Sequence, residues 1–271
     1  MPVGEEPWKA YDIGRLATLF RTDTRQLARS KQPDLAPFLK AADPTAGLIV
    51  FRDGPWSDPA ATMFGSAQES WLAHALAASV GRGQRWQVVG SGTVMGRTRT
   101  PDGVVGWLGP DADERVKARV RRGVAAAKVG LPSNLDAWDG YPAARSRFLA
   151  AAQAADANLI VVSGDSHNAW AYDLANAGRA AGVEFAGQAV TSPGYEGAFS
   201  ADPRAIAAAL IAKNPELKWC DMSRRGYMAL TLTPDRVSNT WVFADTVLAR
   251  NPAANVGHTA TIRRGARTMT A

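Results

Sequence analysis

Leu159-Ile-Val-Val-Ser-Gly-Asp-Ser-His-Asn168 is the most informative stretch of this sequence. Its apolar, β-branched run stops at a glycine, and a carboxylate and an imidazole follow. Such a run is typical of a strand that is buried on both faces of a parallel sheet, and α/β proteins place their chemistry at the carboxyl ends of such strands. The stretch therefore predicts an α/β fold with Asp165 and His167 at the edge of its sheet.

Asp165 and His167 belong to the residue types that bind metal ions, so a metal-assisted hydrolase is the first hypothesis. Two residues do not complete such a site, because a dinuclear centre with cations about 3.5 to 4 Å apart needs about half a dozen hard ligands. A helix N-cap aspartate beside a histidine that is hydrogen-bonded within the protein is the alternative. The spacing alone leaves both interpretations open.

Helical and extended patterns alternate along the rest of the chain. A capping-box pattern, Ser66-Ala-Gln-Glu69, predicts a helix to about Val80, and Pro142 at a first helical position predicts one through Ala154. The other expected elements are a strand ending in a polar turn over 16–25, strands over 48–51, 85–90 and 183–190, helices over 113–128 and 202–212, and a hairpin of 225–233 with 237–243. We expect irregular loop over 32–62, an exposed glycine-rich insertion over 90–109 and a disordered tail over 251–271.

Composition narrows the class of protein. The 271 residues are 46% hydrophobic and 21% charged, and no stretch approaches the roughly 18 apolar residues that a membrane helix needs. The net charge of +6 favours anionic ligands. A basic segment, Arg115 to Lys128, is expected to be a solvated helix face, and nucleic acid is not an expected partner because no aromatic residues interleave with its charges.

The amino-terminal 20 residues show no basic region followed by an apolar one, and Arg15 and Arg21 are not a twin-arginine pair. The default expectation is a cytoplasmic protein, or an extracytoplasmic one if a longer precursor carries a twin-arginine signal. The single cysteine, Cys220, excludes an internal disulfide, and a buried structural thiol is expected. His74 is expected on a helix surface and His258 in the tail.

Two further pairs could contribute to chemistry. Asp23 and Arg25 follow an expected strand, where a guanidinium could bind phosphate, although a structural ion pair is equally consistent with the pattern. Asp139 and Tyr141 flank a glycine and are expected to be presented by a turn. A turn aspartate and a packed tyrosine are the alternative there.

Several segments, taken in order, resemble the alkaline phosphatase D (PhoD-like) metallophosphatases. They are Asp23-Thr-Arg25, Gln68-Glu-Ser-Trp-Leu72, Trp86-Gln-Val-Val-Gly90, Trp138-Asp-Gly-Tyr-Pro142, Gly164-Asp-Ser-His167, Thr191-Ser-Pro-Gly194 and Arg224-Arg-Gly-Tyr227. The resemblance runs from about residue 8 to residue 247. It implies a four-layer α/β/β/α sandwich related to the calcineurin-like and purple acid phosphatases, and hydrolysis of phosphate monoesters and diesters with iron and calcium.

Carried onto this sequence, the resemblance implies that Asp165 and His167 are catalytic metal-site residues. Arg25 and Tyr141 would then contact substrate, with Asp23 and Asp139 just behind the pocket. Members of the family carry earlier Ser-Cys, Gly-Asp-x-x-Tyr-Glu and Asp-Asp-His-Glu motifs that provide most of the metal ligands, and none occurs here.

We therefore expect residues 1–250 to form the carboxyl-terminal portion of the catalytic domain, which would need an amino-terminal half from a longer chain or a partner for full activity. A non-catalytic remnant that retains phosphate or single-metal binding is the alternative. A basic surface-binding module built on Arg115 to Lys128 is the third hypothesis.

Overall fold

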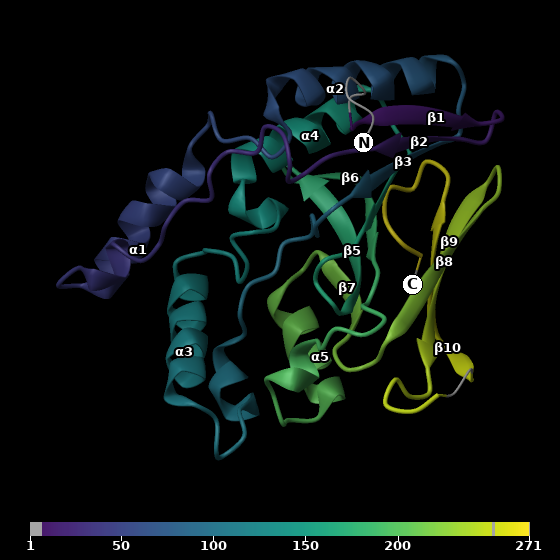
Figure 1. The fold of residues 1–271 in the computed structure, drawn as a ribbon. Coiled ribbons are helices and arrows are strands. Elements are labelled where there is room, and N and C mark those ends of the chain that lie inside the picture. Colours follow the sequence, from purple (N-terminus) through teal and green to yellow (C-terminus); the bar gives the residue numbers. More distant parts are fainter. Residues whose placement is uncertain (1–6, 251–252, 271) are drawn as a thin grey trace.

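A computed structural model describes residues 7–250 and 253–270 of the chain. Two β-sheets and a set of helices make up the molecule (Figure 1). The strands are β1 (Lys9–Ile13), β2 (Ala17–Arg21), β3 (Trp86–Ser91), β4 (Leu159–Ser163), β5 (Ala169–Asn176), β6 (Arg179–Ala186), β7 (Leu217–Asp221), β8 (Gly226–Leu232), β9 (Arg236–Ala244) and β10 (Ala254–Arg263). The α-helices are α1 (Pro44–Asp53), α2 (Gly65–Gly81), α3 (Glu114–Lys128), α4 (Pro142–Ala154) and α5 (Pro203–Lys213).

The larger sheet has seven strands in the order β1-β2-β3-β4-β6-β5-β7. Strands β2, β3, β4 and β6 run parallel to one another, whereas β1, β5 and β7 each pair antiparallel with their neighbours. The predicted buried strand is confirmed as β4, in the middle of this sheet. The carboxyl ends of β2, β3, β4 and β6 therefore meet at one edge, and the segments that follow them can form a single site.

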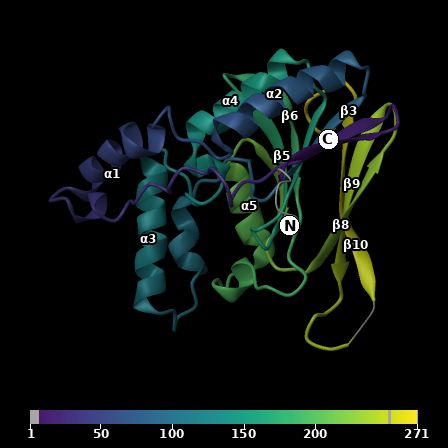
Figure 2. The same cartoon turned by 45° about the horizontal axis from the view of Figure 1, so that its top comes forward.

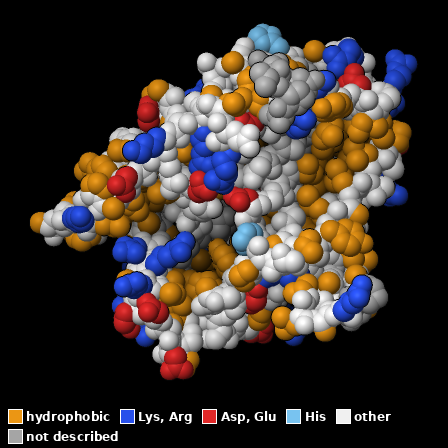
Figure 3. Space-filling model, viewed as in Figure 1, with side chains coloured by type: hydrophobic (Ala, Val, Ile, Leu, Met, Phe, Trp, Pro, Cys, Tyr) orange, Lys and Arg blue, Asp and Glu red, His pale blue; other side chains and the backbone are white. Residues whose placement is uncertain are grey.

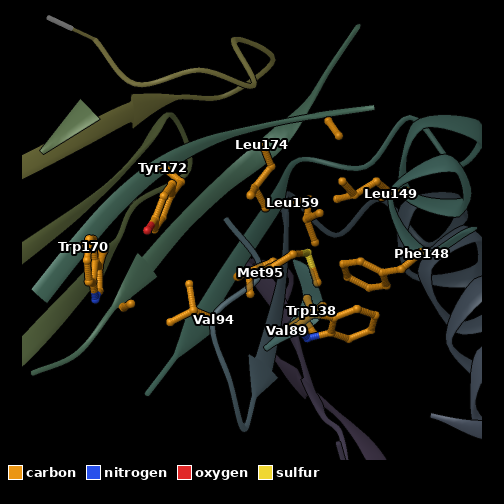
Figure 4. Close-up of a cluster of buried hydrophobic side chains, with 14 of the residues drawn as sticks. Val89, Val94, Met95, Trp138, Phe148, Leu149, Leu159, Trp170, Tyr172 and Leu174 are labelled. Atoms are coloured by element: carbon orange, nitrogen blue, oxygen red, sulfur yellow. The ribbon is translucent and has the colours of Figure 1, made fainter. Parts of the chain in front are cut away.

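Side chains of β4 alternate between two cores, which is why its sequence is apolar throughout. Leu159 and Val161 pack with the helices on one face, together with residues of α2, α4 and α5. Ile160 faces the smaller sheet. Figure 4 shows Leu159 among the side chains of Phe148, Leu149 and Trp138. A strand covered on both faces carries no polar alternation, so the continuous run indicated its position correctly.

The smaller sheet is antiparallel with the order β10-β9-β8, and it lies against the larger sheet (Figure 2). Trp241 of β9 is fully buried between the sheets, and its ring lies 5.7 Å from that of Phe185 in β6. The α/β class is thus confirmed. The described residues form one helical layer and two sheets, and the fourth layer of the expected sandwich is not among the layers we observe.

The prediction of a disordered tail over 251–271 is wrong for residues 253–270, while 251, 252 and 271 lie outside the described residues. Strand β10 pairs with β9 over its whole length, and Ile262 is 2% exposed in the core between the sheets. Beyond the strand, the backbone N–H of Met269 donates to Asp173 of β5 over 2.8 Å. The strand was not predicted because most residues of β10 are exposed and only a few are buried, so the sequence shows no clear apolar pattern there.

The expected strand over 48–51 is also wrong, because this stretch lies inside helix α1. Asp43 caps the helix by accepting hydrogen bonds from the N–H groups of Thr45 and Ala46, and Pro44 occupies its first turn. An Asp-Pro pair before an apolar run is typical of a helix start, so this signal was present in the sequence.

Helix α2 begins at Gly65 without a side-chain cap from its N-cap residue, so the predicted capping box of Ser66 and Glu69 does not form. Thr62 takes over that role. Its hydroxyl accepts from the N–H of Gly65 over 2.8 Å and donates to the carboxylate of Glu69. The helix prediction itself is confirmed, as are those over 113–128, 142–154 and 202–212, to within one residue at each end.

Candidate functional site

The turn that follows β4 has an unusual backbone. Asp165 and His167 have φ angles of 69° and 65°, in the left-handed region that non-glycine residues seldom occupy. Asn168, fully buried, fixes the turn by accepting from the N–H of Tyr195 over 3.2 Å. Trp170 Nε1 donates to Ser166 Oγ over 2.6 Å. Strain of this kind concentrates at functional sites, so the turn is the natural centre of the candidate site.

His167 is exposed, and its ring is oriented by the segment that follows β6. Nδ1 lies 2.9 Å from the carbonyl oxygen of Pro193, which can only accept, so Nδ1 carries the proton and donates. In the neutral ring, Nε2 is then the unprotonated nitrogen. A backbone carbonyl that fixes one nitrogen of an imidazole prepares the other to bind a metal ion or a proton.

Asp165 is engaged by an arginine that lies far away in the sequence. One terminal nitrogen of Arg25 lies 3.0 Å from Asp165 Oδ2 and 2.9 Å from Asp136 Oδ2. The hydrogen bond that Arg25 donates to Asp136 and the negative charge of Asp136 raise the pKa of Arg25. Arg25 therefore links the end of β2 to the turn after β4 and brings the two predicted residues Arg25 and Asp165 together.

Asp23 lies directly behind Arg25, and its predicted place just behind the pocket stays a prediction. Its carboxylate accepts hydrogen bonds from the N–H groups of Arg25, Gln26 and Leu27, over 3.0 to 3.2 Å. Gln68 of α2, fully buried, holds the backbone of Asp23 through both a donated and an accepted bond. Asp23 thus shapes the turn that presents the Arg25 side chain.

Tyr141 is fully buried, and its hydroxyl is occupied within the protein. It donates to the carbonyl of Ser30 over 2.9 Å and accepts from Arg29 Nε over 3.0 Å. Arg29 in turn pairs with Asp136 over 2.6 Å. The structure therefore places Tyr141 behind the arginines, where it positions Arg29. Its predicted contact with substrate stays a prediction.

Asp136, which the sequence did not single out, connects the two arginines. Burial alone would raise its pKa, but the hydrogen bonds and charges of Arg25 and Arg29 outweigh this and hold the pKa below its ordinary value. The carboxylate is thus kept ionised between two guanidinium groups. Its role could not be read from the sequence, because its partners lie more than a hundred residues away.

A cavity of about 290 Å³ lies beside these groups, which we call the site cavity. Asp165 and Ser166 line it from the turn after β4, and Asp139 and Tyr172 line it from deeper in the protein. Figure 3 shows a hollow in this face, with basic, acidic and histidine side chains gathered around it. His167 is not among the residues that line the cavity, so Asp165 and His167 do not both face it.

Asp139 is buried on the short 3₁₀ helix Trp138–Gly140, at the position where a turn was expected. Gly140 is obligatory there, because a Cβ atom would lie 1.9 Å from the carbonyl oxygen of Leu135. Asp139 accepts from the N–H of Thr98 over 3.3 Å and lies 3.8 Å from Arg97 Nε. Burial raises its pKa in spite of the nearby arginine charges.

The segment that follows β3 forms one wall of the site cavity, and its backbone N–H groups anchor it to side chains of other elements. This part of residues 90–109 is therefore not the exposed insertion that the sequence predicted. Met95 is fully buried. Five consecutive N–H groups donate to side chains: Met95 and Gly96 to Glu184 (2.7 and 2.6 Å), Arg97 to Glu216 (3.3 Å), Thr98 to Asp139 (3.3 Å) and Arg99 to Asn214 (2.6 Å). We call residues 95–99 the anchored segment.

Glu184 of β6 is the central anchor. It is fully buried, and burial raises its pKa from 4.5 to about 7 despite hydrogen bonds from Ser163 and the anchored segment. Arg145 of α4 lies beside it, donating to the carbonyl of Met95 over 2.8 Å and pairing with Glu216 over 2.7 Å. These buried charges compensate one another and fix the cavity wall.

The remaining predicted candidates lie apart from this site. His74 Nδ1 donates to the carbonyl of Ser70 on the surface of α2. The ring of His258 stacks on Trp219 at 4.3 Å, and burial lowers its pKa. Cys220 is buried as expected, and burial raises the pKa of its thiol to about 12.

Known proteins with similar sequences point to one family. The sequence model of the family described as PhoD-like phosphatase matches residues 2–241. A curated relative, alkaline phosphatase D of Bacillus subtilis (strain 168), is 28% identical over 183 residues, which is 65% of this chain and 26% of that protein.

A solved structure described as that of PhoD superposes with a TM-score of 0.65 and 22% identity, covering 95% of this chain and 42% of the other. This likeness supports the fold. The chain thus spans about a quarter of the curated relative and less than half of the solved one. Because the family match extends over most of the sequence, the chain belongs to the PhoD-like phosphatases.

Proposed function

We propose that this chain takes part in the hydrolysis of phosphate esters, as a metal-dependent hydrolase of the alkaline phosphatase or phosphodiesterase type. The observation that carries the proposal is the family match over residues 2–241, because it includes the strained turn with Asp165 and His167 at the end of β4. In this proposal both residues are metal ligands, and iron and calcium are the metals. Arg25 binds the phosphate group.

The described residues do not fit a complete metal centre. Within 7–250 and 253–270, no three or more His, Cys, Asp and Glu side chains gather closely enough to hold a metal ion. Asp165 and His167 offer two ligands, while a dinuclear centre needs more. We therefore propose that further ligands come from residues outside the described part, on the same polypeptide or on a partner.

The arginine pairing of Asp165 favours one alternative. Because Arg25 already neutralises this carboxylate, the chain could be a non-catalytic remnant that retains at most phosphate or single-metal binding. The two functions differ in turnover and in metal content.

None of the helices in the described ranges combines the length and apolar character required to cross a bilayer.

Hydrolysis of bis-p-nitrophenyl phosphate and p-nitrophenyl phosphate with added iron and calcium tests the proposal. The full chain is assayed alone and mixed with a separately produced amino-terminal half of a family member, and bound metal is quantified in parallel. We expect turnover only in the mixture, and we expect Asp165→Asn to lower it at least about 100-fold, because a metal ligand is lost.

Asp235→Asn is the matched control, since Asp235 is exposed and lies in the turn between β8 and β9. It should leave turnover unchanged. Background rates in both arms, with stoichiometric phosphate or a single metal ion bound, would establish the remnant instead. Full turnover by Asp165→Asn would refute the assignment of Asp165.

A further inference from the structure

A second cavity of about 340 Å³ adjoins the site cavity, and we call it the apolar cavity. It lies between α3, α5 and the 3₁₀ helices Asp102–Trp107 and Tyr195–Gly197. Its apolar lining includes Val104, Trp107, Val116, Val120, Phe199 and Leu210. Arg119, Ser133 and Tyr195 line both cavities, so one ligand could extend from one into the other.

An aromatic row runs along the junction. Trp170 lies in the site cavity, and its ring centroid is 6.0 Å from that of Tyr195. Tyr195 is 5.6 Å from Phe199, which is 5.6 Å from Trp107 in the apolar cavity. All three pairs meet edge to face, with interplanar angles of 81°, 67° and 89°. Such a wall offers ring faces and edges to a flat apolar group.

The polar groups at the junction are suited to an anion. Arg119 is the one charged residue in the lining of the apolar cavity, and no ion pair or hydrogen bond joins its side chain to another residue of 7–250 or 253–270. The two carboxylates of the site cavity already have arginine partners: Asp165 has Arg25, and Asp139 has Arg97. Arg119, which has no carboxylate partner of this kind, is thus a second guanidinium that can join Arg25 in binding a phosphate group.

We propose that the apolar cavity binds the alcohol part of the substrate, which makes aryl phosphate esters the substrate class of this site. The phosphate lies at Arg119, and the aromatic ring lies against Tyr195 and Phe199. This inference rests on the proposed function, since it concerns the same site. A cavity of this size accepts a group as large as a naphthyl ring, because ligand pockets commonly begin at about 300 Å³.

Calorimetric titration of the full chain tests the proposal without requiring turnover. The probe is 1-naphthyl phosphate, and its separate parts, inorganic phosphate and 1-naphthol, are titrated under the same conditions without added metal. We expect 1-naphthyl phosphate to bind at least about tenfold more tightly than either part, because the ester alone fills both the cationic and the aromatic subsite.

Val120→Trp fills the apolar cavity from α3. This variant should bind 1-naphthyl phosphate only as tightly as inorganic phosphate, and its affinity for inorganic phosphate should equal that of the wild-type chain. Arg122→Trp, exposed on the same helix and lining neither cavity, is the matched control. Arg119→Gln should weaken both phosphate-bearing probes. If circular dichroism shows that Val120→Trp is unfolded, Val116→Trp fills the same cavity.

Equal affinity for 1-naphthyl phosphate and inorganic phosphate would overturn the proposal, as would unchanged binding in both cavity-filling variants. Equal binding of 1-naphthol and its phosphate would also overturn it, because the cavity would then act without the anion site. These outcomes are separate from the proposed function. Hydrolysis of small esters without naphthyl binding refutes the subsite alone, and naphthyl binding without hydrolysis leaves the subsite standing.

Discussion

Glu184 is a buried carboxyl group whose ionisation opposes folding. Its pKa rises from 4.5 in the unfolded chain to about 7 in the folded protein, with burial as the largest cause. A raised carboxyl pKa means that the folded state holds the proton more tightly. The corresponding stability is fully present below about pH 4.5 and is lost as the pH rises toward 7. The expected loss is on the order of 3 kcal/mol.

Urea unfolding of the wild-type chain and of Glu184→Gln between pH 4.5 and 8 checks this prediction. The variant should show a smaller fall in the free energy of unfolding over that range, since the titrating group is gone. It should also be less stable at the acidic end by about 1–3 kcal/mol, because its amide N–H groups would face the donors of Met95 or Gly96. Parallel pH profiles would contradict the assignment.

Sequence reasoning reached those site residues that follow a recognisable strand or turn. Asp165 and His167 were identified because they end a buried strand, and Asp139 because a glycine marks its turn. Asp136 and Glu184 escaped notice, and Arg119 was noted only as part of the basic helix face, since each acquires its significance from side chains distant in the chain. Glu184, for example, anchors amides 88 and 89 residues earlier, a contact for which one sequence carries no local signal.

At the scale of elements, the β5–β6 hairpin turns through Ala177 and Gly178, with φ angles of 49° and 73°. Two left-handed residues in a row are typical of the hairpin turn in which Asn-Gly is preferred. We expect Ala177→Asn to stabilise the protein by about 0.5 kcal/mol and Gly178→Ala to destabilise it by about 1 kcal/mol. Urea midpoints measure both, and a destabilised Ala177→Asn protein would contradict the reading of this turn.

The elements that the sequence predicted well are those with complete signals. Helix α4 has proline in its first turn, and β4 has a continuous apolar run. The antiparallel strands β1 and β7 were missed because each is five residues long and includes charged residues. Helix α1 was read as a strand because the four residues 48–51 have no period of their own, and only the preceding Asp-Pro pair identifies it.

At the scale of the whole molecule, β10 completes the core between the two sheets. Ile262 is 2% exposed there, and the residues after the strand return to the larger sheet at Asp173. We expect Ile262→Ala to lower the free energy of unfolding by about 2–4 kcal/mol, as for other buried large-to-small changes. Val256→Ala, on the same strand but 66% exposed, is the control and should cost far less.

Calorimetry and urea unfolding measure both variants. Equal stability of Ile262→Ala and the wild-type chain would mean that β10 does not seal the core. The two sheets and the helical layer could be anticipated from the family resemblance, which also implied a fourth layer that is not among those of the described residues. The place of the last strand could not, because its burial depends on Trp241 and on the face of a sheet that only the folded chain creates.

The anchored segment has a further consequence for where an anion can bind. Gly90-Ser-Gly-Thr-Val-Met-Gly96 follows a parallel strand and has the glycine content of a loop that cradles phosphate with its amides. Here the amides of Met95 and Gly96 are already saturated by the protein's own carboxylate on β6. The two carboxyl oxygens of Glu184 thus occupy the cradle as part of the fold, and a substrate phosphate is left to arginine side chains such as Arg119 in the cavity lining.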